Sequence, residues 1–432
     1  MYFPRWRTER FAWVSVLVLP VIGAAENLSG TWEFTIMRFG EPMVRRATLQ
    51  DAGGKISGTS RNVKFEGTMQ GETVKLEAHF LNGRPLGSFS GTLLEGVMIG
   101  TAKVFGDQPA TWTAKRPAQR PPGMPTTRRF TPRAFYRAFS SSIEPVMHVH
   151  AGDTVTTWTV DAGGVDANGT RRSLGGNPLT GPFYIEGALP GDTLVVKFNR
   201  IRLNRDSAES GDSIASDRVT PDYFKEVKPL EKFESQWRLD RERGTAVLAH
   251  PTERLKNFSV KLDPMLGCVG VAPPGNQSFQ SGHLGSFGGN MDYNQIREGV
   301  TLYLPVYHTG ALLFVGDGHA AEGDGELTGD ALETSMDVEF TVNVVQDQSS
   351  DMPRAENADY LMAMGVGNSL DEAVQLATTE LARWLERDYK LNSTETAVVL
   401  GTSVRYDIAE LVDPKVNVVA KISKSALAPL RQ

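Results

Sequence analysis

Length, composition and charge set the first limits on this protein. The chain has 432 residues, more than one typical domain, and its 40% hydrophobic and 22% charged residues with 43 Gly and 24 Pro indicate a turn-rich globular protein. A net charge of −6 without a basic run beyond the N-terminus argues against nucleic-acid binding, and a single cysteine excludes an internal disulfide and a zinc–thiolate cluster.

The first 25 residues have the pattern of a secretory signal peptide. Arg5, Arg7 and Arg10 precede an apolar stretch of twelve residues at 11–22, and small residues follow at 23–25. The stretch is shorter than the roughly 20 residues that span a bilayer. We therefore expect cleavage, a periplasmic or secreted mature protein and no membrane span after cleavage. An uncleaved anchor is the alternative.

Residues 28–116 have the pattern of a small antiparallel β domain. Apolar and polar residues alternate over 31–37, which is the period of a half-buried strand. Asn82-Gly83 and Glu95-Gly96 supply hairpin turns, and Gly-Thr pairs recur at 30, 58, 67, 91 and 100. We expect a barrel or a curled sheet. No titratable cluster stands out here, so an accessory role is favoured, with a ligand-binding barrel as the alternative.

A proline-rich stretch at 117–127 predicts a linker, and residues 128–432 then form a second, mainly β domain. Five consecutive apolar residues at 311–315 indicate a strand that is buried on both faces. Other strands are predicted at 154–160, 194–198, 246–250, 300–306 and 338–344.

Helical periodicity appears only near the C-terminus. Apolar residues repeat at three and four between Leu370 and Leu385, and Ser369 with Glu372 forms a capping-box pattern. A second helix is predicted from Asn392 to a point before Pro414. The predicted fold is therefore a mainly β, sandwich-like or barrel-like domain with two C-terminal helices, preceded by a small antiparallel β-barrel-like domain.

The segment 316–326 carries the clearest chemical signal. From Glu298 to Asp351 there are eleven carboxylates and no lysine or arginine. Four of them surround His319 directly after the apolar strand: Asp317, Glu322, Asp324 and Glu326. Crowded carboxylates raise one another's pKa or recruit a cation, and oxygen with imidazole ligands suits a divalent metal. A solvated acidic hairpin is the alternative.

In an extended chain, alternate side chains share one face, so Asp317 and His319 are expected together, as are Asp324 and Glu326. Asp161 follows a predicted strand. Glu186 lies in an otherwise apolar strand, where a carboxylate is costly to bury without a partner. These residues are further candidates for the same site.

Three more features bear on the chemistry. Asn290 and Asp292 follow a glycine cluster, which is typical of a ligand-binding turn. His148 and His150 could share a strand face and bind zinc, although exposed strand histidines are common. Cys268 could be a nucleophile or a small buried side chain. The sequence has no G-x-S-x-G, P-loop or dinucleotide-binding pattern.

Four segments, in this order, resemble the acetamidase/formamidase family: NPLTGPFYIEGALPGD at 177–192, PMLGCVGVAP at 264–273, GGNMD at 288–292 and GDGHAAEGDGE at 316–326. The resemblance covers roughly 133–422. It implies hydrolysis of a short aliphatic amide to carboxylate and ammonia, on a mainly β fold, often in oligomers and with a divalent metal. The signal segment and the domain at 28–116 are not part of the basic family pattern.

This resemblance yields a set of expected roles. The predicted metal ligands, for zinc or calcium, are Asp161, Asp292, Asp317, His319 and Glu326. The predicted catalytic residues are Glu186, Asp324 and His319, and the predicted substrate-binding residues are Asn177 and Asn290. The expected partner is a small amide substrate, and assembly into a homo-oligomer is the further expectation. The alternatives are an exported non-catalytic binder with a structural metal, or a hydrolase of larger or cyclic amides.

Overall fold

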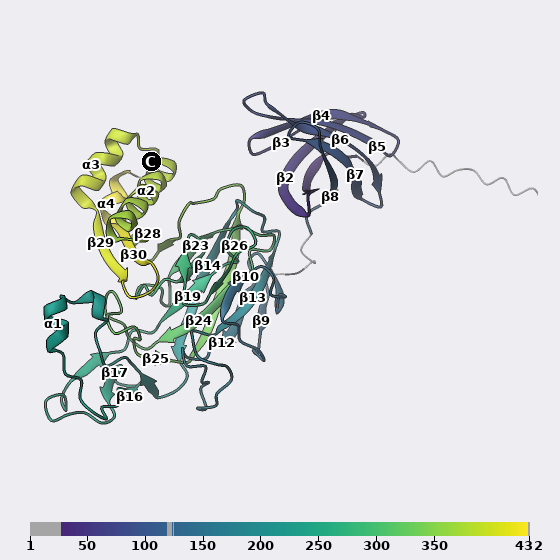
Figure 1. Ribbon diagram of the computed structural model, residues 1–432. Helices are drawn as coiled ribbons and strands as arrows, with labels where there is room; N and C mark the ends of the chain where they lie inside the picture. The colour runs from purple at the N-terminus through teal and green to yellow at the C-terminus, as the bar shows by residue number, and fades with distance from the viewer. Residues whose placement is uncertain (1–26, 119–122, 124, 431–432) are drawn as a thin grey trace, which may run out of the picture. The chain divides into compact units, whose positions relative to one another are not determined.

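The structure is a computed structural model that describes residues 27–118, 123 and 125–430. Its contacts divide the chain into two compact units, Met1–Arg116 and Pro117–Gln432 (Figure 1). The predicted signal peptide at 1–25 lies outside the described residues. Within the described part of the chain, no helix combines the length and the apolar character that crossing a bilayer requires.

Eight antiparallel strands in sequence order close the smaller unit into a barrel. Closure comes from the pairing of β1 with β8, in which Glu33 lies opposite Lys115 and Met37 opposite Thr111. The strands are β1 (Gly30–Arg38), β2 (Glu41–Ala52), β3 (Lys55–Ser60), β4 (Val63–Gln70), β5 (Thr73–Phe80), β6 (Pro85–Leu94), β7 (Val97–Val104) and β8 (Gln108–Lys115).

Aromatic side chains fill the interior of this barrel. The ring of Phe34 stacks on Phe65 at 5.2 Å and on Trp112 at 5.7 Å, and Phe89 meets Trp112 edge-on. Trp32, Phe34 and Trp112 are fully buried. The alternation of apolar and polar residues thus gives the inward and outward faces of the strands, as expected. Such an interior fits a structural core better than an internal ligand cavity.

Two large sheets form the framework of the second unit. One has nine strands in the order β29-β30-β28-β27-β23-β14-β26-β12-β9. Its strands are β9 (Thr127–Arg129), β12 (Thr154–Trp158), β14 (Thr193–Leu203), β23 (Thr301–Pro305), β26 (Met336–Val345), β27 (Arg354–Glu356), β28 (Tyr360–Gly367), β29 (Arg405–Glu410) and β30 (Val416–Ser423).

The other sheet has eleven strands, with the order β18-β17-β16-β15-β25-β24-β19-β22-β21 and with β13 and β11 branching from β24. Its strands are β11 (Met147–His150), β13 (Leu179–Glu186), β15 (Ser207–Glu209), β16 (Gln236–Asp240), β17 (Thr245–Leu248), β18 (Ser259–Lys261), β19 (Met265–Gly270), β21 (Leu284–Gly285), β22 (Gly288–Asn290), β24 (Leu313–His319) and β25 (Glu333–Thr334). A separate pair joins β10 (Ala138–Ser140) to β20 (Ser278–Gln280).

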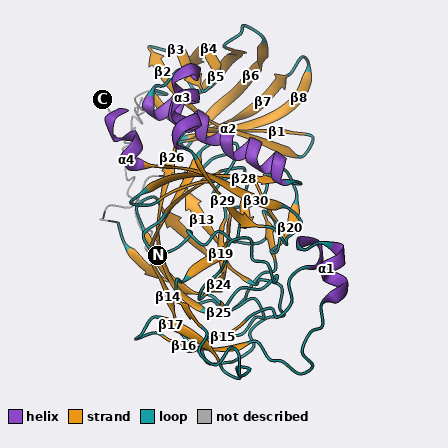
Figure 2. Ribbon diagram, turned by 90° about the vertical axis from the view of Figure 1, so that its left-hand side faces the viewer, coloured by secondary structure: helices purple, strands orange, loops and turns teal. Residues whose placement is uncertain are grey.

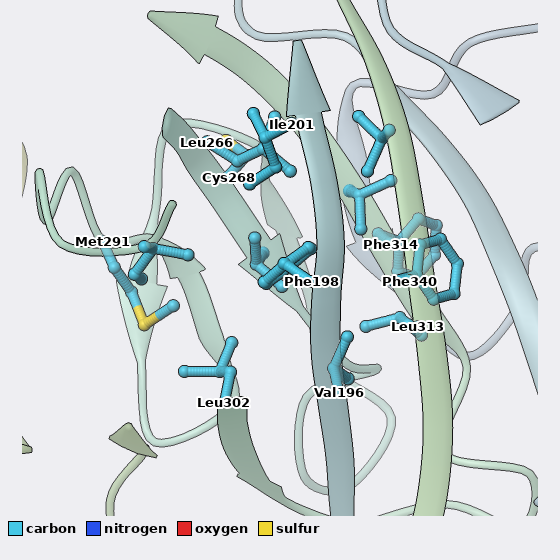
Figure 3. Close-up of a cluster of buried hydrophobic side chains, with 14 of the residues drawn as sticks. Val196, Phe198, Ile201, Leu266, Cys268, Met291, Leu302, Leu313, Phe314 and Phe340 are labelled. Atoms are coloured by element: carbon cyan, nitrogen blue, oxygen red, sulfur yellow. The ribbon is translucent and has the colours of Figure 1, made fainter. Parts of the chain in front are cut away.

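One hydrophobic cluster joins the two sheets. Val196 and Phe198 of β14 belong to the same buried cluster as Leu313 of β24 and Cys268 of β19 (Figure 3). All four are fully buried. Burial of apolar surface between the two sheets is the main source of stability for such a sandwich. The predicted mainly β fold is confirmed.

The helices lie mostly at the C-terminal end. Helix α2 (Leu370–Tyr389) packs on β28 and β30 (Figure 2), and α3 (Ser393–Ser403) and the short α4 (Lys424–Leu427) follow. Ser369 and Asn392 cap α2 and α3 as predicted. Glu395 completes a capping box with Asn392, whereas the side chain of Glu372 accepts from the N–H of Asn368 and leaves the predicted box at Ser369 half formed. The remaining helical turns are η1 (Ser216–Arg218), α1 (Pro221–Glu226) and η2 (Ala428–Leu430).

Candidate active site

Five segments that are distant in sequence meet at one end of β24. Cys268 of β19 lies opposite Asn290 of β22 and Gly316 of β24, and His319 lies opposite Glu333 of β25. The register therefore lines up the ends of β19, β22, β24 and β25 side by side. The loop that precedes β13 and the end of β29 complete the arrangement.

His319 is at the middle of this acidic centre. Its Nδ1 lies 2.8 Å from an oxygen of Glu322, and its Nε2 lies 3.1 Å from Glu333 and 3.7 Å from Asp317. The imidazole and all three carboxylates are almost completely buried. The alternation of a strand places Asp317 and His319 on one face, as the sequence predicted.

A second group of carboxylates lies next to the first. One oxygen each of Asp292, Glu326 and Glu410 come within 4.8 Å of one another, and Asp292 also belongs to a group with His319 and Glu322. The backbone N–H of Ala331 donates to both Glu326 and Glu333, at 2.9 and 3.0 Å. This shared donor holds the two groups together.

Gly267 leaves the space into which the acidic groups point. A Cβ at this position would lie under 3.0 Å from an oxygen of Asp292 and an oxygen of Asp317, and 3.2 Å from Cε1 of His319. Three functional groups from two segments thus converge on one bare backbone position. The need for this open space explains why residue 267 is a glycine.

Backbone conformation at the centre is unusual. Asp292, Asp317 and Glu326 have φ of 37°, 57° and 44°, in the left-handed region that residues other than glycine rarely adopt. Such conformations persist only where the surrounding structure enforces them, and they cluster at functional sites. Here they turn three carboxylates toward one point.

Burial and mutual repulsion shift the pKa values of the centre upward. Burial raises the pKa of Glu326 to about 10, and it raises the pKa of Glu322, Glu333, Glu410 and Asp413 to about 7 each. The pKa of Asp292 is raised by burial and by the charges of Glu326 and Asp317. Burial opposes the charged form of His319, but Glu333 and Asp317 outweigh it and raise its pKa.

The donor set fits a divalent cation. Within the described part of the chain, none of these carboxylates forms an ion pair with lysine or arginine. Five buried oxygens also have no hydrogen-bond partner: Asp292 Oδ1, Asp317 Oδ1, Glu322 Oε1, Glu333 Oε2 and Glu410 Oε2. Unpaired buried carboxylate oxygens are costly unless a cation compensates them. Oxygen ligands with one imidazole are typical of divalent metal sites.

A cleft of about 1100 Å³ reaches this centre. Asn177, Asp330 and Glu333 are among the residues that line it, and Glu333 belongs to the centre. One wall is the loop 161–177, and the other includes β15 and β16. A substrate in the cleft would therefore meet Glu333 before the more deeply enclosed carboxylates.

Asp161, a predicted metal ligand, is paired with arginine instead. Arg205 donates from Nη2 to Asp161 at 2.5 Å, and both side chains are only 10% exposed. The other oxygen of Asp161 accepts from the backbone N–H of Val165 at 2.8 Å. A carboxylate neutralised in this way holds the loop 161–177 in place, and the structure does not group it with the predicted ligands.

Glu186, a predicted catalytic residue, lies away from the centre. Leu179 of β13 is opposite Gly316, and Glu186 is seven residues further along this strand, roughly 20 Å at strand spacing. Its carboxylate contacts Nδ1 of His148 at 2.7 Å. The carboxylate in an apolar strand does have a partner, but that partner is a largely exposed histidine.

Asp324, the other predicted proton carrier, is exposed and accepts a hydrogen bond from Asn294 at 2.7 Å. The expectation that it shares a face with Glu326 is wrong, because the segment is a turn rather than a strand. Glu326 points into the centre, and Asp324 does not.

Asn177 and Asn290 are brought to the centre, but their amides hold other side chains. Asn177 donates to Asn290 and to Asp317, at 3.1 and 2.9 Å. Asn290 donates to Asp292 and to Asp413. These contacts assign both residues to positioning the carboxylates.

Cys268 lies beside the same amide. Its Sγ is 2.6 Å from Oδ1 of Asn290. Burial and the charge of Asp317 raise the pKa of this thiol well above its usual range. A thiol that stays protonated is a poor nucleophile, so the structure favours a small buried donor.

Sequence reasoning missed Glu333, Glu410 and Asp413 as members of the centre. Glu333 was counted among the eleven carboxylates but had no motif around it. Glu410 is the last residue of β29 and Asp413 follows it, in a region predicted to be helical up to Pro414. A period-2 pattern over 405–410 could have indicated this strand.

Replacing Gly267 by alanine is expected to reduce kcat/KM by about 100-fold, because a displacement of catalytic groups by about 1 Å has an effect of this size. The new methyl group would overlap the side chains of Asp292, Asp317 and His319. Gly323→Ala is the matched control, since nothing lies within 4 Å of its added Cβ. Steady-state kinetics of both variants tests this. Equal activity of the two would contradict the described geometry.

The fold and the site together define a class of protein: a β-sandwich with a buried centre of carboxylates and one histidine at the end of a cleft. Residues 284–417 match the model of the Acetamidase/Formamidase family. No curated protein matches the sequence.

Solved structures agree with the family match. A predicted acetamidase/formamidase from Thermoanaerobacter tengcongensis is 26% identical, with a TM-score of 0.61, and covers 72% of this chain and 100% of its own. An acetamidase from Bacillus halodurans is 25% identical (TM-score 0.59; 70% and 100% covered), and one from Yersinia enterocolitica is 26% identical (TM-score 0.60; 72% and 95% covered). The chain thus resembles the acetamidase/formamidase family in sequence over 284–417 and in structure over most of its length, which agrees with the resemblance of its motifs.

Proposed function

We propose that the larger unit hydrolyses the C–N bond of short aliphatic amides, giving a carboxylate and ammonia. The observation that carries this proposal is a buried carboxylate–histidine centre beside a cleft, in a chain that resembles the acetamidase/formamidase family. Amide hydrolysis needs an activated water, stabilisation of the oxyanion and a proton donor for the leaving nitrogen.

Asp292, Asp317, His319 and Glu326 would hold a divalent metal, with Glu410 next to them. When bound, zinc or calcium would supply Lewis-acid polarisation of the carbonyl and a more acidic water. The chain's own contribution is orientation. Glu322 fixes the ring of His319 through Nδ1, and Asn177 and Asn290 fix Asp317 and Asp292 through their amides.

Glu333 is our candidate for the proton carrier, in place of Glu186 and Asp324. It lies in the acidic centre and also on the wall of the cleft, so it can meet both the water and the leaving nitrogen. Its Oε1 is held by the backbone N–H of Ala331 and faces His319, while Oε2 has no hydrogen-bond partner among the described residues. A positioned carboxyl group of this kind can accept a proton from water and return it to nitrogen.

A panel of amides assayed for ammonia release tests the proposed function. Formamide, acetamide and propionamide should be turned over by the protein and not by Asp292→Asn, which keeps the shape of the side chain but removes its charge. Failure of every amide would leave the alternative of an exported binder with a structural metal.

The cleft supports a second candidate. Its volume of about 1100 Å³ is on the scale of pockets for drug-sized ligands and is far larger than acetamide requires. Larger or cyclic amides therefore belong in the same panel. Higher kcat/KM for these substrates than for acetamide would favour the second candidate over the first.

We also propose that the barrel is dispensable for the chemistry, because every group of the acidic centre belongs to the unit Pro117–Gln432. A chain beginning at Pro117 retains the hydrogen bonds of Thr126 to Asp153 and Thr154, which fix the start of this unit. It should stay soluble and keep most of its kcat. Complete loss of activity in a folded, shortened chain would show that the barrel completes the site.

The periplasmic or secreted location rests on residues 1–25 and stays a prediction. The same holds for a homo-oligomer.

A further inference from the structure

One end of the barrel gathers exposed apolar side chains. In an up-and-down barrel the turns after β1, β3, β5 and β7 share one end. Three of these turns carry a large apolar residue that faces solvent: Phe39 is 78% exposed, Leu81 60% and Phe105 40%. Exposed apolar residues that gather in this way usually mark an interaction surface.

Two of these residues occupy positions that do not suit them. Phe39 and Phe105 have φ of 52° and 51°, and each is followed by a glycine with positive φ. Phe39 lies in a two-residue hairpin turn, in which Asn-Gly is strongly preferred, and Phe105 begins a three-residue turn. Bulky side chains rarely adopt the left-handed conformation that both positions have. Neither folding nor solubility favours phenylalanine here, so the choice of residue points to a role at the surface.

Contacts connect the separate turns into one surface. The guanidinium of Arg38 lies 4.7 Å from the ring centroid of Phe105, and its Nη1 donates to Gln108 at 3.1 Å. The ring of Phe80 lies 6.5 Å from that of Phe105. The turns after β1, β5 and β7 are thereby tied to one another.

Basic and polar groups accompany the apolar ones. Arg38, Arg61 and Arg84 belong to the same turns, against Glu41 and Asp107 of opposite charge. Between the last two hairpins is a hollow of about 560 Å³, lined by Phe80, Asn82, Arg84, Pro85, Phe105 and Gly106. A guanidinium and an amide beside aromatic rings can receive a phosphate while the rings remain in apolar surroundings.

We propose that this apolar–basic end, formed by Phe39, Leu81 and Phe105 with Arg38, Arg61 and Arg84, docks on a membrane surface that contains anionic phospholipid. The aromatic and aliphatic tips would enter the headgroup region, and the arginines would pair with lipid phosphates.

The local charge at this end of the barrel, not the net charge of the chain, favours an anionic partner. The chain carries a net charge of −6, so an anionic surface repels the molecule as a whole. A local excess of arginine around exposed rings is what binding to such a surface requires. The partner would hold the barrel at the membrane and leave the chemistry to the other unit.

Vesicle flotation tests the proposal with the chain from residue 27 onward, which removes the apolar N-terminal segment as a source of binding. The protein should float with phosphatidylcholine vesicles that contain 30% phosphatidylglycerol and not with pure phosphatidylcholine. Raising the salt from about 0.1 to 0.5 M should weaken binding, since screening reduces the charge term. Equal binding to both vesicle types would overturn the proposal, as would no binding to either.

The double variant Phe39→Asn, Phe105→Asn should bind at least tenfold more weakly. Asn suits these turn positions, so thermal melting should show an equal or higher Tm, and misfolding cannot explain the loss. Arg84→Gln should reduce the preference for anionic lipid. The matched control is Leu94→Thr, which removes a 51% exposed leucine beside the turn after β6, at the other end of the barrel. Unchanged binding of the double variant would also overturn the proposal.

Discussion

Chelation is expected to abolish amide hydrolysis and to lower the melting temperature of the larger unit. Seven carboxylates surround one histidine in the centre: Asp292, Asp317, Glu322, Glu326, Glu333, Glu410 and Asp413. Without a cation they repel one another, by about 1 kcal/mol for a pair 4 Å apart in water and by more where water is excluded.

The expected change in Tm follows from the free energy of metal binding to the folded state. A metal present at 100 times its Kd stabilises the folded state by about 2.7 kcal/mol, which is roughly 4 °C in Tm for a unit as large as Pro117–Gln432. Adding zinc or calcium after the chelator should restore both activity and Tm, and the metal that does so identifies the natural one. Asp292→Asn serves as the control, because a variant with a damaged site should respond less to the chelator.

The pH dependence of the chelated protein gives an independent check. Burial raises the pKa of Glu322 and Glu333 from the ordinary 4.5 to about 7, so the folded state keeps protons that the unfolded chain has lost. Their contribution to stability is fully present below about pH 4.5 and is lost as the pH rises through 7. The Tm of the chelated protein should therefore fall across this window, and added metal should reduce the fall.

Full activity in chelator, with protein that metal analysis shows to be metal-free, would contradict the metal-assisted mechanism. Direct proton transfer by the buried carboxyl groups would then be the leading account.

His319→Ala is expected to reduce kcat below detection and to weaken metal binding. The imidazole contacts Asp317, Glu322 and Glu333, and it is the only base that pairs with the acidic centre among the described residues. Removing one partner of a buried charged pair typically costs about 3–5 kcal/mol, because the remaining charge has no compensation. Activity assays, metal analysis and thermal melting measure the three consequences.

His148→Ala is the matched control. This histidine also contacts a carboxylate, Glu186, but its side chain is 60% exposed, and exposed pairs contribute about 1 kcal/mol or less. Activity and metal content should be unchanged. Normal turnover of His319→Ala, or loss of turnover in His148→Ala, would show that the centre has been placed in the wrong part of the fold.

Local patterns predicted the fold well. Alternation over 31–37 gave β1, and the capping residues Ser369 and Asn392 gave the starts of α2 and α3. These signals depend on neighbours within a few residues, so the sequence contains them directly. The pairing of strands that are distant in sequence has no such signal.

The site shows the same contrast between local signals and contacts over long distances in sequence. Asp317 and His319 are two residues apart on one strand, and their proximity could be predicted from strand geometry. Asp324 and Glu326 have the same spacing, but they lie in a turn rather than a strand, so the alternation of side chains does not apply to them. Asp161 is neutralised by Arg205, which lies 44 residues further along the chain. No local pattern in the sequence indicates this pairing.

The distances in sequence that the acidic centre spans also determine when it can form. Its groups come from Asn177 to Asp413, so most of the larger unit must fold before they meet. Long loops must close first, which makes this a late step in folding. Because a cation has no preformed site in the unfolded chain, metal would be acquired only at the end of folding. With the proposed metal, newly made protein would pass through a stage in which it is nearly folded but has no metal, and it would then be most sensitive to the supply of metal around it.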